Sequence, residues 1–149
     1  MDELDQLEVF ARGLVENLSS TARKSLARNI AKDLRTSQAK RIADQRNPDG
    51  SAYQPRKPQK SNKKGRIKRA MFSKIRLNKH LKAKVTDQSV TIEFTGNTER
   101  IARVHQFGLR DRVSRIRTLS VQYPQRQLLG FSEADKAHIQ NLVIEHLAK

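Results

Sequence analysis

Four histidines carry the side chains best suited to metal binding or proton transfer: His80, His105, His138 and His146. None has a second histidine or a carboxylate at a spacing typical of a metal site. His138 and His146 stand about two helical turns apart, so a single metal ion would not reach both. We therefore interpret the histidines as surface or boundary residues. For His105, within VHQFG, a buried and hydrogen-bonded position is the alternative, and it is also structural.

Nucleophiles and paired carboxylates have no setting for catalysis either. The sequence has no G-x-S-x-G elbow, phosphate-binding loop or G-x-G-x-x-G pattern, and its six glycines are dispersed. The candidate acids Glu93, Glu99 and Asp111 stand in Arg-rich segments, where ion pairing is the ordinary role. We expect no enzyme, no cofactor, no metal and no small-molecule substrate. A cleft in which His105 meets an acid would be the observation that favours an enzyme.

Positive charge is the dominant property of the chain. The formal net charge is +16, and the stretch from Arg56 to Lys84 holds 13 Lys and Arg without one acid. Such a block predicts contact with a polyanion, and two partners remain open: nucleic acid bound without sequence preference, or an acidic protein surface. Aromatic residues are sparse, so base stacking on single strands has weak support. The contact residues predicted in this block are Arg56, Lys57, Lys60, Lys63, Lys64, Arg66, Lys68 and Arg69.

A second basic set is built from arginine alone, since no lysine occurs between Val85 and Asp135. Arginine suits planar, bidentate pairing at interfaces, although ordinary solvated charges are the alternative. From this set we predict partner contacts at Arg110, Arg112, Arg115, Arg117 and Arg126.

The elements that would position these residues begin with helices. Apolar residues at steps of three and four predict an antiparallel helix pair over residues 3–17 and 20–44. Asn47-Pro48-Asp49-Gly50 predicts a type I turn. The proline-containing, polar residues 51–65 predict an exposed basic arm or long loop.

The second half of the chain alternates short elements. We expect a short helix over 66–79, a β-hairpin from LKAKV and SVTIEF, and a helix in TERIARVHQFG that ends at Gly108. RDRVSRIRTLSVQY fits either a strand or a loop. YPQRQLLGFSEAD reads as a junction with Leu128 and Leu129 buried, followed by a final helix capped by Ser132 and Asp135.

Together these elements predict an α+β fold with an N-terminal helix pair, a small antiparallel β-sheet, a C-terminal helix and a long basic loop or arm. The length of 149 residues fits a single domain over 1–149. There are no cysteines, and no run of about 18 apolar residues that would cross a membrane, so we expect a soluble protein.

Four stretches in fixed order carry a resemblance: RIADQRNPDGSAYQPRK, RIKRAMFSKIR, IARVHQFG and YPQRQLLGFSEAD. With them the chain resembles the phage virion-morphogenesis or tail-completion proteins of Mu-like and related contractile-tailed phages and prophages. The resemblance implies a late structural protein that completes the tail and makes it competent to join the head. It also implies a homo-oligomeric ring at the head-proximal end of the tail.

The implied partners are other phage tail or connector proteins and further copies of the chain, without a membrane. The implied location is the virion tail or neck, after assembly in the cytoplasm of the bacterial host. A sequence-independent nucleic-acid-binding module is the alternative function, motivated by the charge of +16 and the acid-free block.

Overall fold

The computed structural model describes residues 5, 6, 8, 9, 12, 13, 16, 18–56, 70–112 and 119–148. The chain divides into two compact units. The first unit comprises Met1–Ser37, Lys82–Glu93 and Phe131–Lys149, and the second comprises Gln38–Leu81 and Phe94–Gly130. The single domain predicted from the length stays a prediction. Within the described part of the chain, no helix is long and apolar enough to cross a membrane.

Helix α2, Ser20–Ala43, confirms the second helix of the predicted pair. The Ser19 hydroxyl accepts a hydrogen bond from the Ala22 N–H at 3.1 Å, which satisfies one of the free donors at the helix start. Of the helix predicted over 3–17, residues 5, 6, 8, 9, 12 and 13 are helical, and most others lie outside the described residues. The pairing of the two helices therefore stays a prediction.

Helix α4, Glu133–Leu147, begins at the predicted capping box. The Ser132 hydroxyl accepts from the Asp135 N–H at 3.0 Å, and the Asp135 carboxylate accepts from the Ser132 N–H at 3.1 Å. Ile139 and Val143 are buried, as expected for the apolar face of this helix. The capping box thus determines where α4 begins, and the helical spacing of its apolar residues determines which face is buried.

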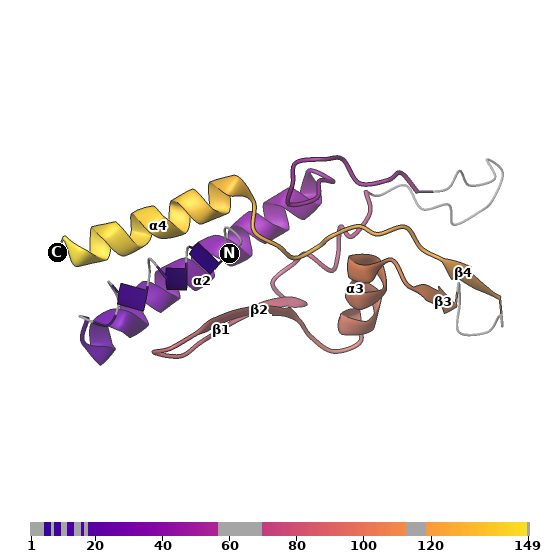
Figure 1. Cartoon of the computed structure of the whole chain (residues 1–149). Helices are drawn as coiled ribbons and strands as arrows, with labels where there is room; N and C mark the ends of the chain where they lie inside the picture. The colour runs from indigo at the N-terminus through magenta and orange to yellow at the C-terminus, as the bar shows by residue number, and fades with distance from the viewer. Residues whose placement is uncertain are drawn as a thin grey trace. The chain divides into compact units, whose positions relative to one another are not determined.

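The first unit packs α4 and a β-hairpin against α2 (Figure 1). Strands β1, Leu81–Val85, and β2, Val90–Phe94, form the predicted hairpin. Leu34 of α2 and Ile139 of α4 are buried together, with Ile30 and Ile92 packed beside them. Helices α2 and α4 are antiparallel. Three side-chain contacts show this, because residue numbers increase along α2 as they decrease along α4: Asn29–His146, Asp33–His138 and Ser37–Asp135.

The second unit contains α3, Thr98–Phe107, and a second small sheet. Gly108 ends α3 with φ 64° and ψ 53°, the left-handed conformation that glycine adopts without strain. Strand β3, Arg110–Arg112, pairs antiparallel with β4, Ser120–Gln122, and Asp111 lies opposite Val121. For this segment the sequence predicted either a strand or a loop, and both of its described ends are strands. Residues 113–118 lie outside the described part.

The helix predicted over 66–79 is wrong for its described residues. Residues 71–80 form successive turns, and residues 66–69 lie outside the described part. Phe72 adopts φ 64°, which a right-handed helix does not permit. The phenyl ring packs edge-on to Tyr53 and to His105, with centroids 5.8 Å and 4.8 Å away. These long-range ring contacts outweigh the local helical spacing.

The exposed arm predicted over 51–65 is corrected at Tyr53, whereas Ser51, Ala52, Gln54 and Pro55 are exposed. Gly50 N–H donates to the Asn47 carbonyl at 2.9 Å, confirming the predicted turn, and Arg46 pairs with Ala52 across it. Tyr53 is only 4% exposed, because its N–H donates to the Gln45 carbonyl and its ring lies in the core of the second unit. Residues 57–65 lie outside the described part, so the arm itself stays a prediction.

Candidate interaction site

The segment from Tyr123 to Gly130 is extended but pairs with no strand over most of its length. Backbone polar groups in such a segment need partners, and here side chains supply them. Gln106 is central: its side-chain oxygen accepts from the Leu128 and Leu129 N–H groups at 2.8 and 2.9 Å. Its amide nitrogen donates to the Leu129 carbonyl at 2.9 Å. The other side chains that bind this backbone are Gln38, Arg41, Asn47 and Tyr53.

The end of this segment has no room for a side chain at Gly130. A Cβ built there would lie 2.5 Å from Cγ of Pro48. Gln38 meets both backbone groups of Gly130, accepting from the N–H at 3.2 Å and donating to the carbonyl at 2.9 Å. The NPDG turn is thereby packed against the last residue of the extended segment.

Arg126 lies inside the second unit and is 5% exposed. Its guanidinium donates to the carbonyls of Gln54 at 2.8 Å and Pro55 at 3.3 Å, and one nitrogen lies 3.3 Å from Nδ1 of His105. Burial, together with the neighbouring charge of Arg56, lowers the pKa of Arg126. The observed contacts of Arg126 are thus within the chain, and the partner contact predicted for it stays a prediction.

His105 belongs to a row of four packed rings. Its imidazole lies 4.8 Å from the Phe72 centroid and 5.0 Å from that of Tyr123, and Phe72 continues to Tyr53. Burial and the charge of Arg126 lower the pKa of His105 to about 4, so the imidazole is neutral at pH 7. Burial likewise raises the pKa of Tyr53 to about 12. Of the two positions predicted for His105, the packed and hydrogen-bonded one is observed.

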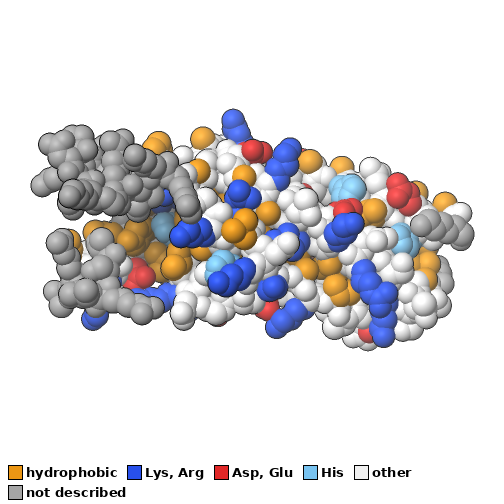
Figure 2. All heavy atoms as spheres, turned by 180° about the vertical axis from the view of Figure 1, so that it is seen from behind, with side chains coloured by type: hydrophobic (Ala, Val, Ile, Leu, Met, Phe, Trp, Pro, Cys, Tyr) orange, Lys and Arg blue, Asp and Glu red, His pale blue; other side chains and the backbone are white. Residues whose placement is uncertain are grey.

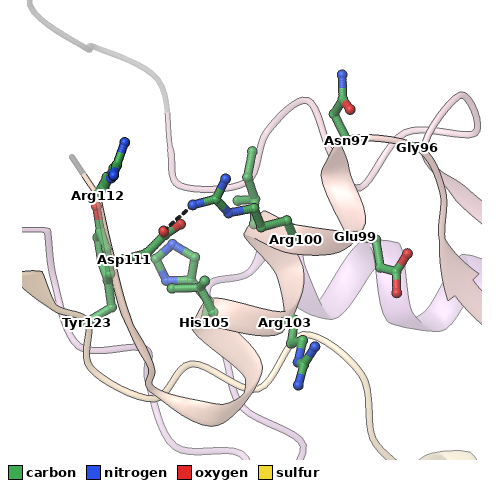
Figure 3. A pocket seen from close by; sticks show the side chains of 11 residues that line it. Gly96, Asn97, Glu99, Arg100, Arg103, His105, Asp111, Arg112 and Tyr123 are labelled. Carbon is green, nitrogen blue, oxygen red and sulfur yellow. Dashed lines mark hydrogen bonds and ion pairs between the residues drawn. The ribbon is translucent and has the colours of Figure 1, made fainter. Parts of the chain in front are cut away.

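A cavity of about 990 Å³ opens beside α3 in the second unit. Figure 3 shows Arg100 reaching from α3 to Asp111 of β3, and the two groups form an ion pair of 2.5 Å. The hydrogen bond from Arg100 is the largest cause of the lowered pKa of Asp111. Arg103 and Arg112 are also part of the lining, and their side chains extend away from each other in Figure 3. Neither guanidinium group donates a hydrogen bond to any residue that the structure describes. Glu99, Ile101, His105 and Tyr123 also line the cavity.

This cavity brings His105 and an acid into one lining, the arrangement that would favour an enzyme. However, the carboxylate of Asp111 is bound by Arg100, and the side-chain contact of His105 is with Arg126. A histidine pressed between two rings and an arginine is poorly placed to accept a proton. Among the described residues, no three His, Cys, Asp or Glu side chains gather as metal ligands.

Comparison with known proteins decides the family. Residues 2–148 match the model of the phage virion morphogenesis family. The chain belongs to this family. It is 38% identical over 151 aligned positions to the "Tail completion protein S" of Escherichia phage P2, and the alignment covers the whole of both chains. No solved structure matches the chain. The resemblance carried by the four quoted stretches is therefore confirmed.

Within this member of the virion morphogenesis family, most predicted contact residues lie outside the described part. These are Lys57, Lys60, Lys63, Lys64, Arg66, Lys68, Arg69, Arg115 and Arg117. Arg110 and Arg112 are exposed on β3, and Arg56 is half-buried. On the face in Figure 2, Lys and Arg side chains are distributed over the described surface, while Asp and Glu are few. The structure places Arg112 in the cavity lining.

The residues that hold the extended segment were not found from the sequence. Gln38 left a signal, because it stands four residues from both Leu34 and Ile42 on the buried face of α2. A polar residue on such a face indicates a satisfied buried group. Gln106 and Arg41 left no comparable signal in their local sequence. Their partners in the extended segment are more than twenty residues away along the chain.

Proposed function

We propose that this chain is a tail completion protein, a structural protein that finishes the phage tail and prepares it for joining to the head. The observation that carries the proposal is the 38% identity to the tail completion protein of phage P2, which extends over both chains from end to end. The protein would be made in the bacterial host cytoplasm and retained in the virion tail or neck. Its partners would be other phage tail or connector proteins.

The proposed mode of action is a homo-oligomeric ring at the head-proximal end of the tail. Large apolar side chains exposed in the second unit offer surface for contacts between copies, because the fully buried core of a protein interface is more apolar than the rest of the surface. Ile101, Phe107, Leu109 and Leu119 are exposed by 38 to 62%. The second unit offers these surfaces on a scaffold in which side-chain hydrogen bonds hold the extended segment 123–130.

Deleting the gene from the phage or prophage that encodes it tests the proposal. We expect filled heads and separate tails that do not join, with particles restored when the chain is supplied from a plasmid. Sedimentation velocity of the purified chain should show a single oligomer larger than a monomer. Infectious particles formed at the normal yield without the chain would overturn the assembly role.

A nucleic-acid-binding module is the second candidate, favoured by 13 Lys and Arg without an acid between Arg56 and Lys84. It predicts binding to duplex DNA that weakens steeply as salt rises, because counterions are released from the phosphates. Replacing Lys63, Lys64, Lys68 and Arg69 by Gln should weaken that binding. Absence of binding to duplex and single strands at low salt would rule out this candidate.

A further inference from the structure

We propose that the cavity beside α3 receives the acidic N-terminal segment of a second copy of the chain. The proposal rests on the homo-oligomer proposed above and identifies one of its contacts. The receiving surface comprises Arg103 and Arg112, whose guanidinium groups donate no hydrogen bond to any described residue, and Ile101, which is 47% exposed. A fitting occupant combines carboxylates with apolar side chains.

The charge of the chain argues for that occupant. Residues 1–17 carry a net charge of −4, from five acids and one arginine, so the remaining residues carry +20, from 30 Lys and Arg against 10 Asp and Glu. Copies of such a chain repel one another unless the acidic stretch lies at the contact. Leu4, Leu7 and Phe10 stand between the acids and supply the apolar component.

Acids elsewhere in the chain are less suited to this contact, because most of the described ones are engaged. Glu93 pairs with Lys84 at 2.8 Å, and Asp33 lies 2.7 Å from Nε2 of His138. Asp111 pairs with Arg100, and Asp135 belongs to the capping box of α4. The N-terminal stretch is the most concentrated source of negative charge, with five acids in 17 residues, although Glu8 forms an ion pair with Arg12 of the same stretch.

The lining also favours a peptide over a nucleic acid. Glu99 and Asp111 are part of it, and carboxylates oppose a chain of phosphates. The carboxylate of Glu99 accepts no hydrogen bond from any described residue, so a peptide carrying both carboxylates and N–H donors fits the mixed lining better. A segment from one copy that enters the cavity of the next gives a head-to-tail contact, and such contacts form a ring when the rotation between successive copies closes.

A charge-swap experiment on the full-length chain tests this contact. Arg103→Glu with Arg112→Glu reverses the charge of two cavity residues, and Asp2→Lys with Glu3→Lys reverses the charge of the first two acids of the segment. We expect each double variant to associate about ten-fold more weakly than the wild type in sedimentation velocity. An equimolar mixture should regain wild-type association, because each reversed segment then meets a reversed cavity. Lys24→Glu with Lys32→Glu, two exposed residues of α2, is the charge-matched control and should associate normally.

Three results would overturn the proposal. The cavity variant could associate like the wild type, which removes this contact and leaves the oligomer intact. The two reversed variants could fail to associate when mixed, although circular dichroism shows both to be folded. The cavity variant could lose binding to duplex DNA and keep its association, which assigns the cavity to nucleic acid. A wild-type chain that is monomeric at every concentration refutes instead the oligomer on which the proposal rests.

A second measurement does not depend on folding of the cavity variant. A fluorescent peptide of residues 1–17 is titrated with the Asp2→Lys, Glu3→Lys protein, whose own segment competes poorly. Fluorescence anisotropy should show binding that weakens about ten-fold when the peptide carries the same two substitutions. Equal binding of both peptides would contradict the proposed charge recognition.

Discussion

Replacing Gln106 by Ala removes the side chain that holds the extended segment after β4. In the native chain the Gln106 amide makes three hydrogen bonds to the backbone of Leu128 and Leu129, at 2.8 to 2.9 Å. Leu128 is fully buried, so water reaches its N–H group poorly once the amide is gone. The substitution leaves two donors and one acceptor without their partners.

The loss in the free energy of unfolding follows from the three backbone groups of Leu128 and Leu129 that lose their partners. An intramolecular hydrogen bond contributes about 1 kcal/mol, and a buried group left unsatisfied costs about 1–3 kcal/mol. The three groups together therefore predict a loss of about 3 kcal/mol in the free energy of unfolding. Alanine regains a few tenths of a kcal/mol within α3 through its higher helix propensity. The net loss of roughly 2–3 kcal/mol is a large share of the stability of a domain of this size.

Denaturant unfolding followed by circular dichroism measures this loss. All variants are compared at one protein concentration, because association adds to apparent stability. Gln125→Ala is the matched control: it removes one exposed hydrogen bond, to the Gln106 carbonyl at 3.2 Å, and should cost less than about 0.5 kcal/mol. Gln106→Glu should fall between the two, because a carboxylate still accepts from both N–H groups but repels the Leu129 carbonyl.

A free energy of unfolding of Gln106→Ala within about 0.5 kcal/mol of the wild-type value would refute this prediction, because leaving the three groups without partners would then have no measurable cost. Equal free energies of unfolding for Gln106→Glu and Gln106→Ala would also refute it, because the two N–H groups that still donate to the glutamate would then contribute no stability.

Three further predictions concern neighbouring features. Gly130→Ala should destabilise the chain by about 1–3 kcal/mol in denaturant unfolding, because the added Cβ meets Cγ of Pro48, and Pro48→Ala should restore part of the loss. The free energy of unfolding should fall as pH drops from about 6.5 to about 4, because the unfolded chain takes up a proton at His105 that the folded chain does not. In denaturant unfolding at several pH values, His105→Phe should reduce this pH dependence, and an unchanged dependence would refute the prediction. Ser132→Ala should cost about 1 kcal/mol by losing its bond to the Asp135 N–H, whereas Ser132→Thr should cost much less in the same assay.

Elements determined by local chemistry could be predicted from the sequence. The start of α2 follows Ser19, the start of α4 follows the Ser132 capping box, and α3 ends at Gly108, where a left-handed conformation is required. Each of these signals acts within about four residues of chain. The hairpin of β1 and β2 follows equally from alternation and a short turn.

Features determined by distant contacts could not be predicted. Phe72 has a positive φ and leaves the helical path because its ring packs against Tyr53 and His105, which are 19 and 33 residues away. Tyr53 is buried, although its neighbours are prolines and polar residues, which predicted an exposed arm. In both cases an aromatic side chain gains more from burial in the second unit than its local sequence indicates. Tyr123 joins the cavity lining, otherwise drawn from residues 96–112, through its ring contact with His105.

The arginines show why a basic composition does not by itself identify a binding surface. Arg41 and Arg126 donate to backbone carbonyls within the second unit. Arg103 and Arg112 are part of the cavity lining, and their guanidinium groups donate to no described residue. We expect neutralising Arg41 or Arg126 to reduce assembly by destabilising the fold, and neutralising Arg103 or Arg112 to reduce it by weakening a contact between copies. Measuring both the free energy of unfolding and the association of each variant separates the two effects. Arg126→Gln should lower the free energy of unfolding, because two carbonyl contacts of a buried guanidinium are lost. Arg103→Gln should leave unfolding unchanged and lower association alone.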